Sequence, residues 1–451
     1  MGRSLRALFL ALTILASYGL HYVVATVFGW KRTAARFERV HAVNAKRLAT
    51  GCTELRGVFI KLGQVLSVLG GFLPRAYGRE LERLQDRVPP RPFPEIEGRL
   101  KEALGPDALA RFASFSREPI AAASLAQVHR ATTMDGRSVA VKVLYPGIET
   151  LIQRDLAVLR TLLPVFRRLL PISRFDRILD QLSAMLARET DYSQERRNIE
   201  TVRAIFSDRS DVVVPTVVSE LTAGGVLTMT FEDGIKVTDF ASIDAAGIDR
   251  DAVARLLVEI YWAMLLEHRV FHADPHPGNF LVRPGPTLVM LDYGAVEECT
   301  PALAEGMMDV VLGGVSRDAE RVLAGLERMG FVAPSGDREM LQRVGREYLK
   351  VIANVRIDDY SQIDRDAVEK IAGFEGIRGK LREIMTNIEY PEGYFYVERT
   401  IVLLFGLVGQ LAPKAGLPGI AGPVAAQAML RSFAAQAAAA PGPESEAPAS
   451  A

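Results

Sequence analysis

The stretch FHADPHPGNFLV, residues 271–282, places two histidines, an aspartate and a Gly-Asn pair within a single short segment. Its His-x-Asp-x-His spacing allows the corner of a metal site, because histidine and carboxylate side chains are common metal ligands. Asp274 and Asn279 are instead separated by four residues. That is the spacing of a phosphoryl-transfer loop, in which the Asp lies near the transferred phosphate and the Asn binds magnesium. The rest of the chain has to decide between these two interpretations.

A zinc-like site would require further ligands beside His272 and His276. The other histidines do not supply a set with suitable spacing; they are His21, His41, His129 and His268. We therefore favour the phosphoryl-transfer interpretation and expect His272 to brace the loop. The two cysteines, Cys52 and Cys299, are too few for a disulfide framework. We expect both to be buried thiols in a reducing compartment.

A lysine-bearing strand precedes this loop in the sequence. VAVK, residues 139–142, reads as a strand in which alternate side chains share a face, so that Ala140 and Lys142 point the same way. The third strand of a kinase offers such a pair, with a small residue over the adenine ring and an ammonium over the phosphates. The alternative is a solvated lysine on an amphipathic strand.

One acidic motif precedes the Asp274 loop in the sequence, and another follows it. ETDYSQE, residues 189–195, lies in a helical pattern and offers Glu189, Asp191 and Glu195 as partners for lysines. A carboxylate beside a lysine keeps the ammonium charged, although a solvated charged face gives the same pattern. LDYG, residues 291–294, follows a predicted strand. Asp292 there takes the place of the Asp-Phe-Gly aspartate, which holds magnesium on the nucleotide phosphates.

Strand and helix signals occur in the order of a kinase. Apolar and polar residues alternate on both sides of Asp135-Gly136, which is a strong hairpin signal. Helical patterns cover residues 148–170 and 175–206, and strands are expected at residues 211–221 and 225–231. From residue 239 the chain is mostly helical, with two short strands. This order predicts an α+β fold with the two lobes of a protein kinase and a nucleotide cleft between them.

The N-terminal segment is apolar and flanked by basic residues. ALFLALTILASYGLHYVVATVFGW, residues 7–30, is long enough to cross a bilayer. A cleaved signal peptide and a buried core helix are the alternatives. More Lys and Arg follow the segment than precede it, which predicts that the main body lies in the cytoplasm. We expect a single-pass protein of a bacterial-type inner membrane.

The overall charge and the C-terminal segments add two expectations. Lys plus Arg and Asp plus Glu both number 54, which argues against nucleic acid as a partner. The apolar run at residues 401–412 is too short to cross a membrane and predicts a buried core helix. Residues 434–451 are of low complexity and predict a disordered tail.

Six motifs together resemble the successive signatures of the UbiB/AarF family of atypical protein-kinase-like ATPases. They are KLGQ (residues 61–64), AAAS (121–124), VAVK (139–142), ETDY (189–192), HADPHPGN (272–279) and LDYG (291–294). The resemblance covers roughly residues 33–430. It implies a helical extension before the kinase-like lobes. The implied domains are a transmembrane anchor (1–30), the helical extension (31–118), the N-lobe with inserted helices (119–233), the helical C-lobe (234–433) and the tail (434–451).

The resemblance also assigns roles to individual residues. It implies that Lys142 pairs with Glu195, that Asp274 is catalytic, and that ATP or ADP binds with Mg²⁺. Asn279 and Asp292 would be the metal ligands. The nucleotide-binding residues would be Ala121, Ala122, Ala123, Ser124, Ala140 and Lys142. A regulatory set would comprise Lys61, Gln64, Glu189 and Asp191, with Lys61 meeting the two acids.

The alanine-rich loop and three further departures distinguish the chain from ordinary kinases. Alanine resists positive φ, so the loop lacks the freedom of a glycine-rich one. Ala273 replaces the arginine of His-Arg-Asp, His276 replaces a lysine, and no Ala-Pro-Glu follows Asp292. The chain thus keeps nucleotide and metal residues but lacks the peptide-docking segment.

The resemblance implies a membrane-anchored Mg-nucleotide ATPase or atypical kinase that supports isoprenoid quinone synthesis. Its implied partners are nucleotide, membrane lipid and quinone precursors or quinone-biosynthesis proteins, and a homodimer stays open. Two alternatives remain: a kinase of a small-molecule or protein substrate, and a nucleotide-binding pseudokinase scaffold.

Overall fold

The computed structural model describes residues 2–55, 57–68, 75–82, 90–169, 175–316, 318–332 and 393–412, together with residues 339, 391, 420, 422–424 and 426–427. The chain divides into two compact units. The first unit comprises Met1–Ile199 and Pro215–Glu232, and the second comprises Glu200–Val214 and Asp233–Ala451. The tail predicted at residues 434–451 lies outside the described residues.

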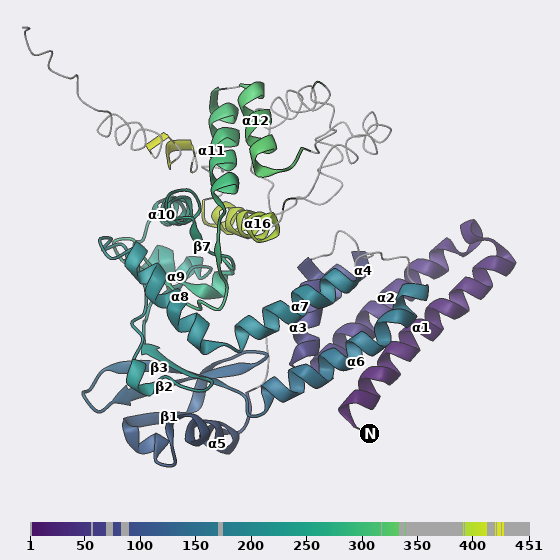
Figure 1. Cartoon of the computed structure of the whole chain (residues 1–451), viewed down its shortest axis with the longest axis horizontal. Helices are drawn as coiled ribbons and strands as arrows, with labels where there is room; N and C mark the ends of the chain where they lie inside the picture. The colour runs from purple at the N-terminus through teal and green to yellow at the C-terminus, as the bar shows by residue number, and fades with distance from the viewer. Residues whose placement is uncertain are drawn as a thin grey trace, which may run out of the picture. The chain divides into compact units, whose positions relative to one another are not determined.

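The first unit contains an antiparallel four-stranded sheet in the order β1-β2-β3-β5 (Figure 1). Its strands are β1 (Phe112–Ala122), β2 (Ala126–Thr133), β3 (Ser138–Leu144) and β5 (Val226–Thr230). The predicted hairpin joins β2 to β3, and Gly136 in its turn has a φ of 86°, which glycine adopts without steric cost. The valines of β3 are completely buried: Val139, Val141 and Val143. Lys142 therefore lies on the other face, as the alternation predicts.

One predicted strand, residues 211–221, is interrupted. Only β4 (Val212–Val213) forms there, and it pairs with β9 (Thr287–Met290) of the second unit. Beyond Pro215, Thr216 and Val218 hydrogen-bond to the backbone of β5, and the segment ends in the 3-10 turn η4 (Ser219–Leu221). Proline has no N–H and cannot continue a strand ladder. The segment is consequently divided, with its first part in one sheet and its second part beside the other.

Helices make up the rest of the first unit. Most of them pack together as α1 (Arg3–Phe28), α2 (Trp30–Leu55), α3 (Val58–Val68), α4 (Arg75–Glu82), α6 (Ile148–Leu169) and α7 (Phe175–Glu189). Next to the sheet lie α5 (Phe93–Leu104) and the turn η3 (Ala108–Arg111). Cys52 and Leu81 are completely buried in the helical core. Burial raises the pKa of the Cys52 thiol to about 12, so this cysteine is a protonated, inert core residue. Cys299 is buried as well.

Helix α1 is long and apolar enough to cross a membrane, judged by length and composition over Leu5–Phe28. One of its faces nevertheless packs on α2, where the hydroxyl of Tyr18 hydrogen-bonds His41 at 2.8 Å and Asn44 is completely buried. At its start, Arg3 forms an ion pair of 2.6 Å with the buried Asp155 of α6. The other face exposes large apolar side chains, including those of Phe9, Leu12, Leu20, Val23 and Val27.

The helical pattern over residues 175–206 forms two helices instead of one. α7 ends at Glu189, and α8 (Tyr192–Ile205) begins after Asp191. The Asp191 carboxylate accepts the backbone N–H groups of Ser193 and Gln194, which is the action of a helix N-cap. The cap starts a new helix at this point, and Glu195 consequently lies in the first turn of α8.

The second unit contains a sheet in the order β4-β9-β8-β6 and a two-stranded ribbon. Its remaining strands are β6 (Ile235–Lys236), β8 (Phe280–Arg283), β7 (Val270–His272) and β10 (Val296–Glu298). Its helices and helical turns are α9 (Phe240–Ala245), α10 (Arg250–Trp262), the π-helical turn η5 (Ala263–His268), the 3-10 turn η6 (Pro277–Asn279), α11 (Pro301–Ser316), α12 (Ala319–Met329) and α16 (Tyr394–Leu411). α16 packs on α10, and its Leu404, Leu407 and Leu411 are buried. This agrees with the core helix predicted from the apolar run.

Two glycines allow α11 and α12 to approach closely. A Cβ atom added at Gly306 would lie 2.6 Å from the carbonyl oxygen of Gly325, and one added at Gly325 would lie 2.5 Å from that of Gly306. Both contacts are with backbone atoms, which cannot rotate away. A Cβ added at Gly314 of α11 meets nothing within 4 Å.

We predict that Gly306→Ala lowers the free energy of unfolding by about 1–3 kcal/mol, because the methyl group forces the two helices apart. Gly314→Ala in the same helix should instead be neutral or stabilising by up to about 1 kcal/mol, because alanine is the better helix former. Denaturant unfolding followed by circular dichroism measures both. Equal effects of the two substitutions would show that the helix contact does not contribute to stability.

Candidate functional site

A buried ion pair joins the sheet of the first unit to α8. Lys142 Nζ lies 2.7 and 3.0 Å from the two carboxylate oxygens of Glu195. The side chain of Glu195 is only 1% exposed and that of Lys142 is 15% exposed. The Lys142 ammonium also lies 5.4 Å from the centre of the Tyr192 ring, a favourable cation–π distance. The first unit thus holds a positive charge at a fixed place on β3.

The alanine-rich segment turns between β1 and β2. Ala121 and Ala122 end β1 in register with Val128 and Gln127, and the N–H of Ala123 donates to the carbonyl of Ala126 at 2.8 Å. Ser124 is buried. None of the described non-glycine residues of this turn has a positive φ, which agrees with the resistance of alanine to that conformation.

The proposed regulatory residues come together only in part. Lys61 of α3 forms an ion pair with Glu189 at the end of α7. The described structure does not bring Asp191 into this pair, because its carboxylate caps α8. Gln64 lies in α3, but its side chain is outside the described residues. Lys61 therefore meets one acid of the Glu-x-Asp motif, and the second acid has a structural role.

In the second unit, His272 joins the Asp274 loop to the Asp-Tyr-Gly segment. It is 1% exposed. Its Nδ1 accepts the N–H of Asp274 at 3.3 Å, and its Nε2 lies 2.5 Å from the carbonyl oxygen of Asp292. Since Nδ1 is an acceptor here, we assign the ring proton to Nε2, which donates to that carbonyl. The side chain braces the loop, as expected, and it also fixes the backbone of the Asp-Tyr-Gly segment.

Asp274 has a partner that sequence reasoning missed. Arg399 of α16 places Nη2 2.8 Å from Oδ1 of Asp274. The two residues are far apart in the sequence, and only the fold brings them together. The available signal was a Glu-Arg pair, Glu398 and Arg399, in an otherwise apolar helix. The arrangement supplies a cation to the loop whose own arginine position holds Ala273.

Asn279 and Asp292 lie side by side at the end of the β8–β9 hairpin, where the N–H of Leu291 donates to the carbonyl of Asn279 at 2.8 Å. The Asn279 Nδ2 donates to the carbonyl of Asp274, so its amide oxygen is the atom that can meet a cation. Asp292 is exposed and has a φ of 56°, a left-handed conformation that Asp tolerates better than most residues. An amide oxygen beside a carboxylate is a donor set suited to Mg²⁺.

The alternative histidine metal site receives no support from the contacts of His276. Its Nδ1 accepts the N–H of Gly278 at 3.1 Å and caps the short turn η6. Among the residues that the structure describes, no group of three or more His, Cys, Asp and Glu side chains is arranged to hold a metal. His272 and His276 both serve the conformation of the loop.

A lysine on a small antiparallel sheet that pairs with a glutamate on a following helix, and then a mostly helical unit with an Asp-x-x-x-x-Asn loop, define a kinase-like protein. The model of the ABC1 atypical kinase-like domain matches residues 83–326. The chain belongs to this family, which is also called UbiB/AarF.

Individual relatives agree with this membership. The chain is 32% identical to the chloroplastic protein ACTIVITY OF BC1 COMPLEX KINASE 8 of Arabidopsis thaliana, over 85% of this chain and 54% of the relative. It is 34% identical to AarF domain-containing protein kinase 1 of Xenopus tropicalis, over 65% of this chain and 57% of that protein. The chain thus spans little more than half of these two relatives.

A solved structure shows a similar fold. Rv3197 of Mycobacterium tuberculosis, determined in complex with erythromycin, is 26% identical to this chain and has a TM-score of 0.55. The alignment covers 87% of this chain and 99% of Rv3197. The likeness thus extends well beyond residues 83–326, the part that the family model matches.

We predict that Lys142→Met destabilises the protein by about 3–5 kcal/mol, because it leaves the Glu195 carboxylate buried without its cation. The double variant Lys142→Met/Glu195→Leu should recover most of that loss, since it removes both charges and keeps apolar volume. Chemical unfolding of the wild type, both single variants and the double variant completes the cycle. A double variant that is no more stable than Lys142→Met would contradict a direct pairing.

Proposed function

We propose that this protein is a Mg-nucleotide-binding atypical kinase or ATPase. The observation that carries the proposal is the buried Lys142–Glu195 pair, found in a chain of the ABC1 family. The charge of Lys142 is kept in a fixed position although it is costly to bury, which is the property that phosphate binding requires. Asn279 and Asp292 provide the oxygen ligands for a metal ion.

Each residue has a separate part in this proposal. Lys142 binds the nucleotide phosphates, and Glu195 orients its ammonium. Asn279 and Asp292 hold Mg²⁺, which neutralises charge on the phosphates when it is bound. Asp274 orients the attacking hydroxyl or water and accepts its proton. The alanine-rich turn and Ala140 bind the rest of the nucleotide.

Several features favour hydrolysis over protein phosphorylation. β10 and α11 follow Asp292 almost directly, with α11 beginning at Pro301, so no long peptide-docking segment is present there. One oxygen of Asp274 is already paired with Arg399. By family resemblance, Lys61 and Gln64 belong to a helix that restricts access by a protein substrate. The Lys61–Glu189 ion pair would hold α3 against α7 in that role.

The metabolic setting and the alternatives rest on family resemblance. We propose support of isoprenoid quinone synthesis, with quinone precursors or quinone-biosynthesis proteins as partners. A kinase of another small molecule or of a protein is the second candidate, and a pseudokinase scaffold is the third. The fate of the ATP γ-phosphate distinguishes these three candidates. Free phosphate identifies the ATPase, a phosphorylated product identifies the kinase, and binding without turnover identifies the scaffold.

We predict that Asp292→Asn abolishes Mg²⁺-dependent nucleotide binding, because the metal loses its charged ligand. Asparagine also tolerates positive φ, so the fold should persist. Calorimetric titration with ADP, with and without Mg²⁺, measures the effect. Asp208→Asn, at an exposed position of the same unit, is the matched control. Wild-type affinity in Asp292→Asn with Mg²⁺ present would refute the metal assignment.

We further propose that α1 anchors the protein to a membrane. Its length, its composition and its exposed apolar face support this. The finer proposal is a single-pass span with the main body in the cytoplasm. Spanning requires α1 to leave α2 and to break the Arg3–Asp155 ion pair, at a cost that lipid contact would have to offset.

We predict that changing Phe9, Leu12, Leu20 and Val23 to Gln releases the protein from membranes. These side chains are 51–64% exposed, so the change removes lipid-facing area and spares the α2 contact. Each exposed apolar side chain adds about 1.5–3 kcal/mol of burial when it enters lipid. Sedimentation of membranes at high salt measures the partition. A variant that stays in the membrane pellet would place the anchor elsewhere in the chain.

A further inference from the structure

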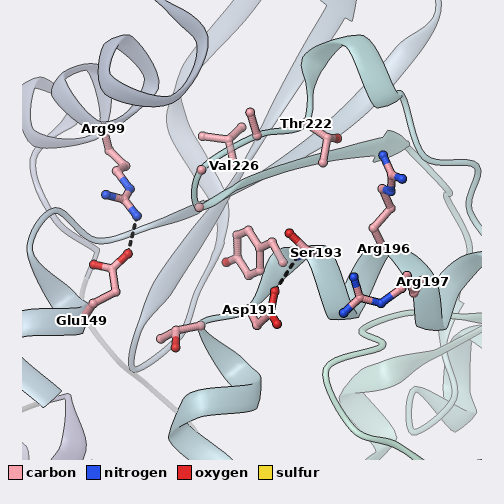
Figure 2. A pocket seen from close by; sticks show the side chains of 13 residues that line it. Arg99, Glu149, Asp191, Ser193, Arg196, Arg197, Thr222 and Val226 are labelled. Atoms are coloured by element: carbon pink, nitrogen blue, oxygen red, sulfur yellow. Dashed lines mark hydrogen bonds and ion pairs between the residues drawn. The ribbon is translucent and has the colours of Figure 1, made fainter. Parts of the chain in front are cut away.

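A cavity of about 710 Å³ lies within the first unit, and its lining includes none of the residues assigned to nucleotide or metal. Five segments line it: α5, the start of α6, the corner between α7 and α8, the first half of α8, and the turn before β5. Its volume is within the usual range for small-molecule sites, roughly 300–1,000 Å³. Figure 2 shows Arg99 and Glu149 on one side of it and Arg196 and Arg197 on the other.

Three arginines line the cavity, Arg99, Arg196 and Arg197, together with two acids. Arg99 is matched by Glu149 and by Glu102, and the Asp191 carboxylate accepts backbone N–H groups. Among the described residues, Arg197 donates to the neutral amide oxygen of Gln194 and meets no carboxylate. The cavity therefore presents the guanidinium charge of Arg197, with the Arg196 side chain from the same helix beside it.

The turn before β5 is shaped around one of these arginines. Gly224 and Gly225 both have positive φ, at 45° and 88°. A Cβ atom at Gly225 would lie 2.4 Å from Nη2 of Arg99. Any other residue would displace the guanidinium from its place over the turn. The glycine thus admits Arg99 to the cavity wall.

The N-terminus of α8, where the helix dipole is positive, is not the group that would bind an anion here. The N–H groups of Ser193 and Gln194 in its first turn are bound by Asp191. An incoming anion would therefore be held by side-chain guanidinium groups. These bind the oxygens of a phosphate through paired, planar hydrogen bonds, better than any other side chain.

We propose that this cavity binds a small ligand carrying a doubly charged phosphate group. A soluble phosphate monoester and the headgroup of phosphatidic acid share this chemistry. The ligand would bridge α8 to the turn before β5, with Arg196 and Arg197 on its phosphate. None of the residues proposed to bind nucleotide or metal lines this site.

The cavity is joined to the ion pair of the first unit. Tyr192 lines the cavity, and its ring lies 5.4 Å from Lys142 Nζ. Arg196 and Arg197 directly follow Glu195 in α8. A ligand whose phosphate binds these arginines would shift α8. This shift would change the distance between Lys142 and Glu195. This regulatory part rests on the proposed function, whereas the binding site itself does not.

Calorimetric titration of the full chain with phenyl phosphate, without Mg²⁺ or nucleotide, tests the site. We expect saturable binding that the double variant Arg196→Gln/Arg197→Gln weakens about tenfold or more, since each loses charge-assisted hydrogen bonds. Arg203→Gln, an exposed position of α8 outside the cavity lining, should bind as the wild type does. Equal binding by the double variant, or no binding by the wild type, overturns the site.

A second pair of variants avoids changing the arginines. Ala223 is exposed and lines the cavity. Ala223→Glu should weaken phenyl phosphate binding, and Ala223→Lys should preserve or strengthen it. Equal affinities in these two variants overturn the proposal even if the arginine variants do not fold. The same variants with vesicles of phosphatidylcholine, with and without phosphatidic acid, show which source of phosphate is bound.

The regulatory part has its own readout. MgADP affinity measured with phenyl phosphate saturating the cavity should differ from the affinity without it, and Ala223→Glu should abolish the difference. Unchanged MgADP affinity overturns the coupling. Absence of MgADP binding in the wild type overturns the proposed function and leaves the phosphate titrations as the test of the site.

Discussion

The carboxylate of Glu195 is almost entirely buried, and its charge is tolerated because the Lys142 ammonium meets both of its oxygens. This contact makes two distant elements depend on each other. β3 must alternate so that three valines enter the core and Lys142 faces the other way. α8 must begin at Tyr192 so that Glu195 falls in its first turn, and the Asp191 cap sets that start. Tyr192 takes its position against the same pair, with its ring 5.4 Å from Lys142 Nζ.

In the second unit, a buried histidine holds two segments together through hydrogen bonds. His272 uses both ring nitrogens, one for the N–H of Asp274 and one for the carbonyl of Asp292. The ribbon of β7 and β10 binds the flanking segments to each other, and the β8–β9 hairpin places Asn279 beside Asp292. Loop, hairpin and ribbon thus hold an acid, an amide and a second acid in place. Arg399 adds the positive charge that the loop itself lacks.

Much of this structure could be predicted from short stretches of the sequence. The hairpin at Asp135-Gly136, the face of Lys142 and the bracing by His272 all follow from period, turn chemistry or motif. What sequence reasoning missed depends on tertiary contacts or on competing local effects. Arg399 reaches Asp274 only because α16 packs in the second unit. The break at Asp191 was hidden by a continuous helical pattern, although an Asp followed three residues later by Gln is a capping signal. Pro215 ended a strand that composition alone would have continued. The apolar period of α1 could not reveal its polar contacts with α2.

The proposed function needs both units to respond to Mg-nucleotide, the first through Lys142 on β3 and the second through Asn279 and Asp292. Hydrogen exchange of the wild-type chain with and without MgADP tests it most directly, because exchange is read segment by segment. We expect slower exchange in residues 138–144 and 192–199 and also in residues 272–280 and 290–294, with both effects lost when Mg²⁺ is chelated. Protection confined to one of the two units, or protection that persists without Mg²⁺, would contradict it.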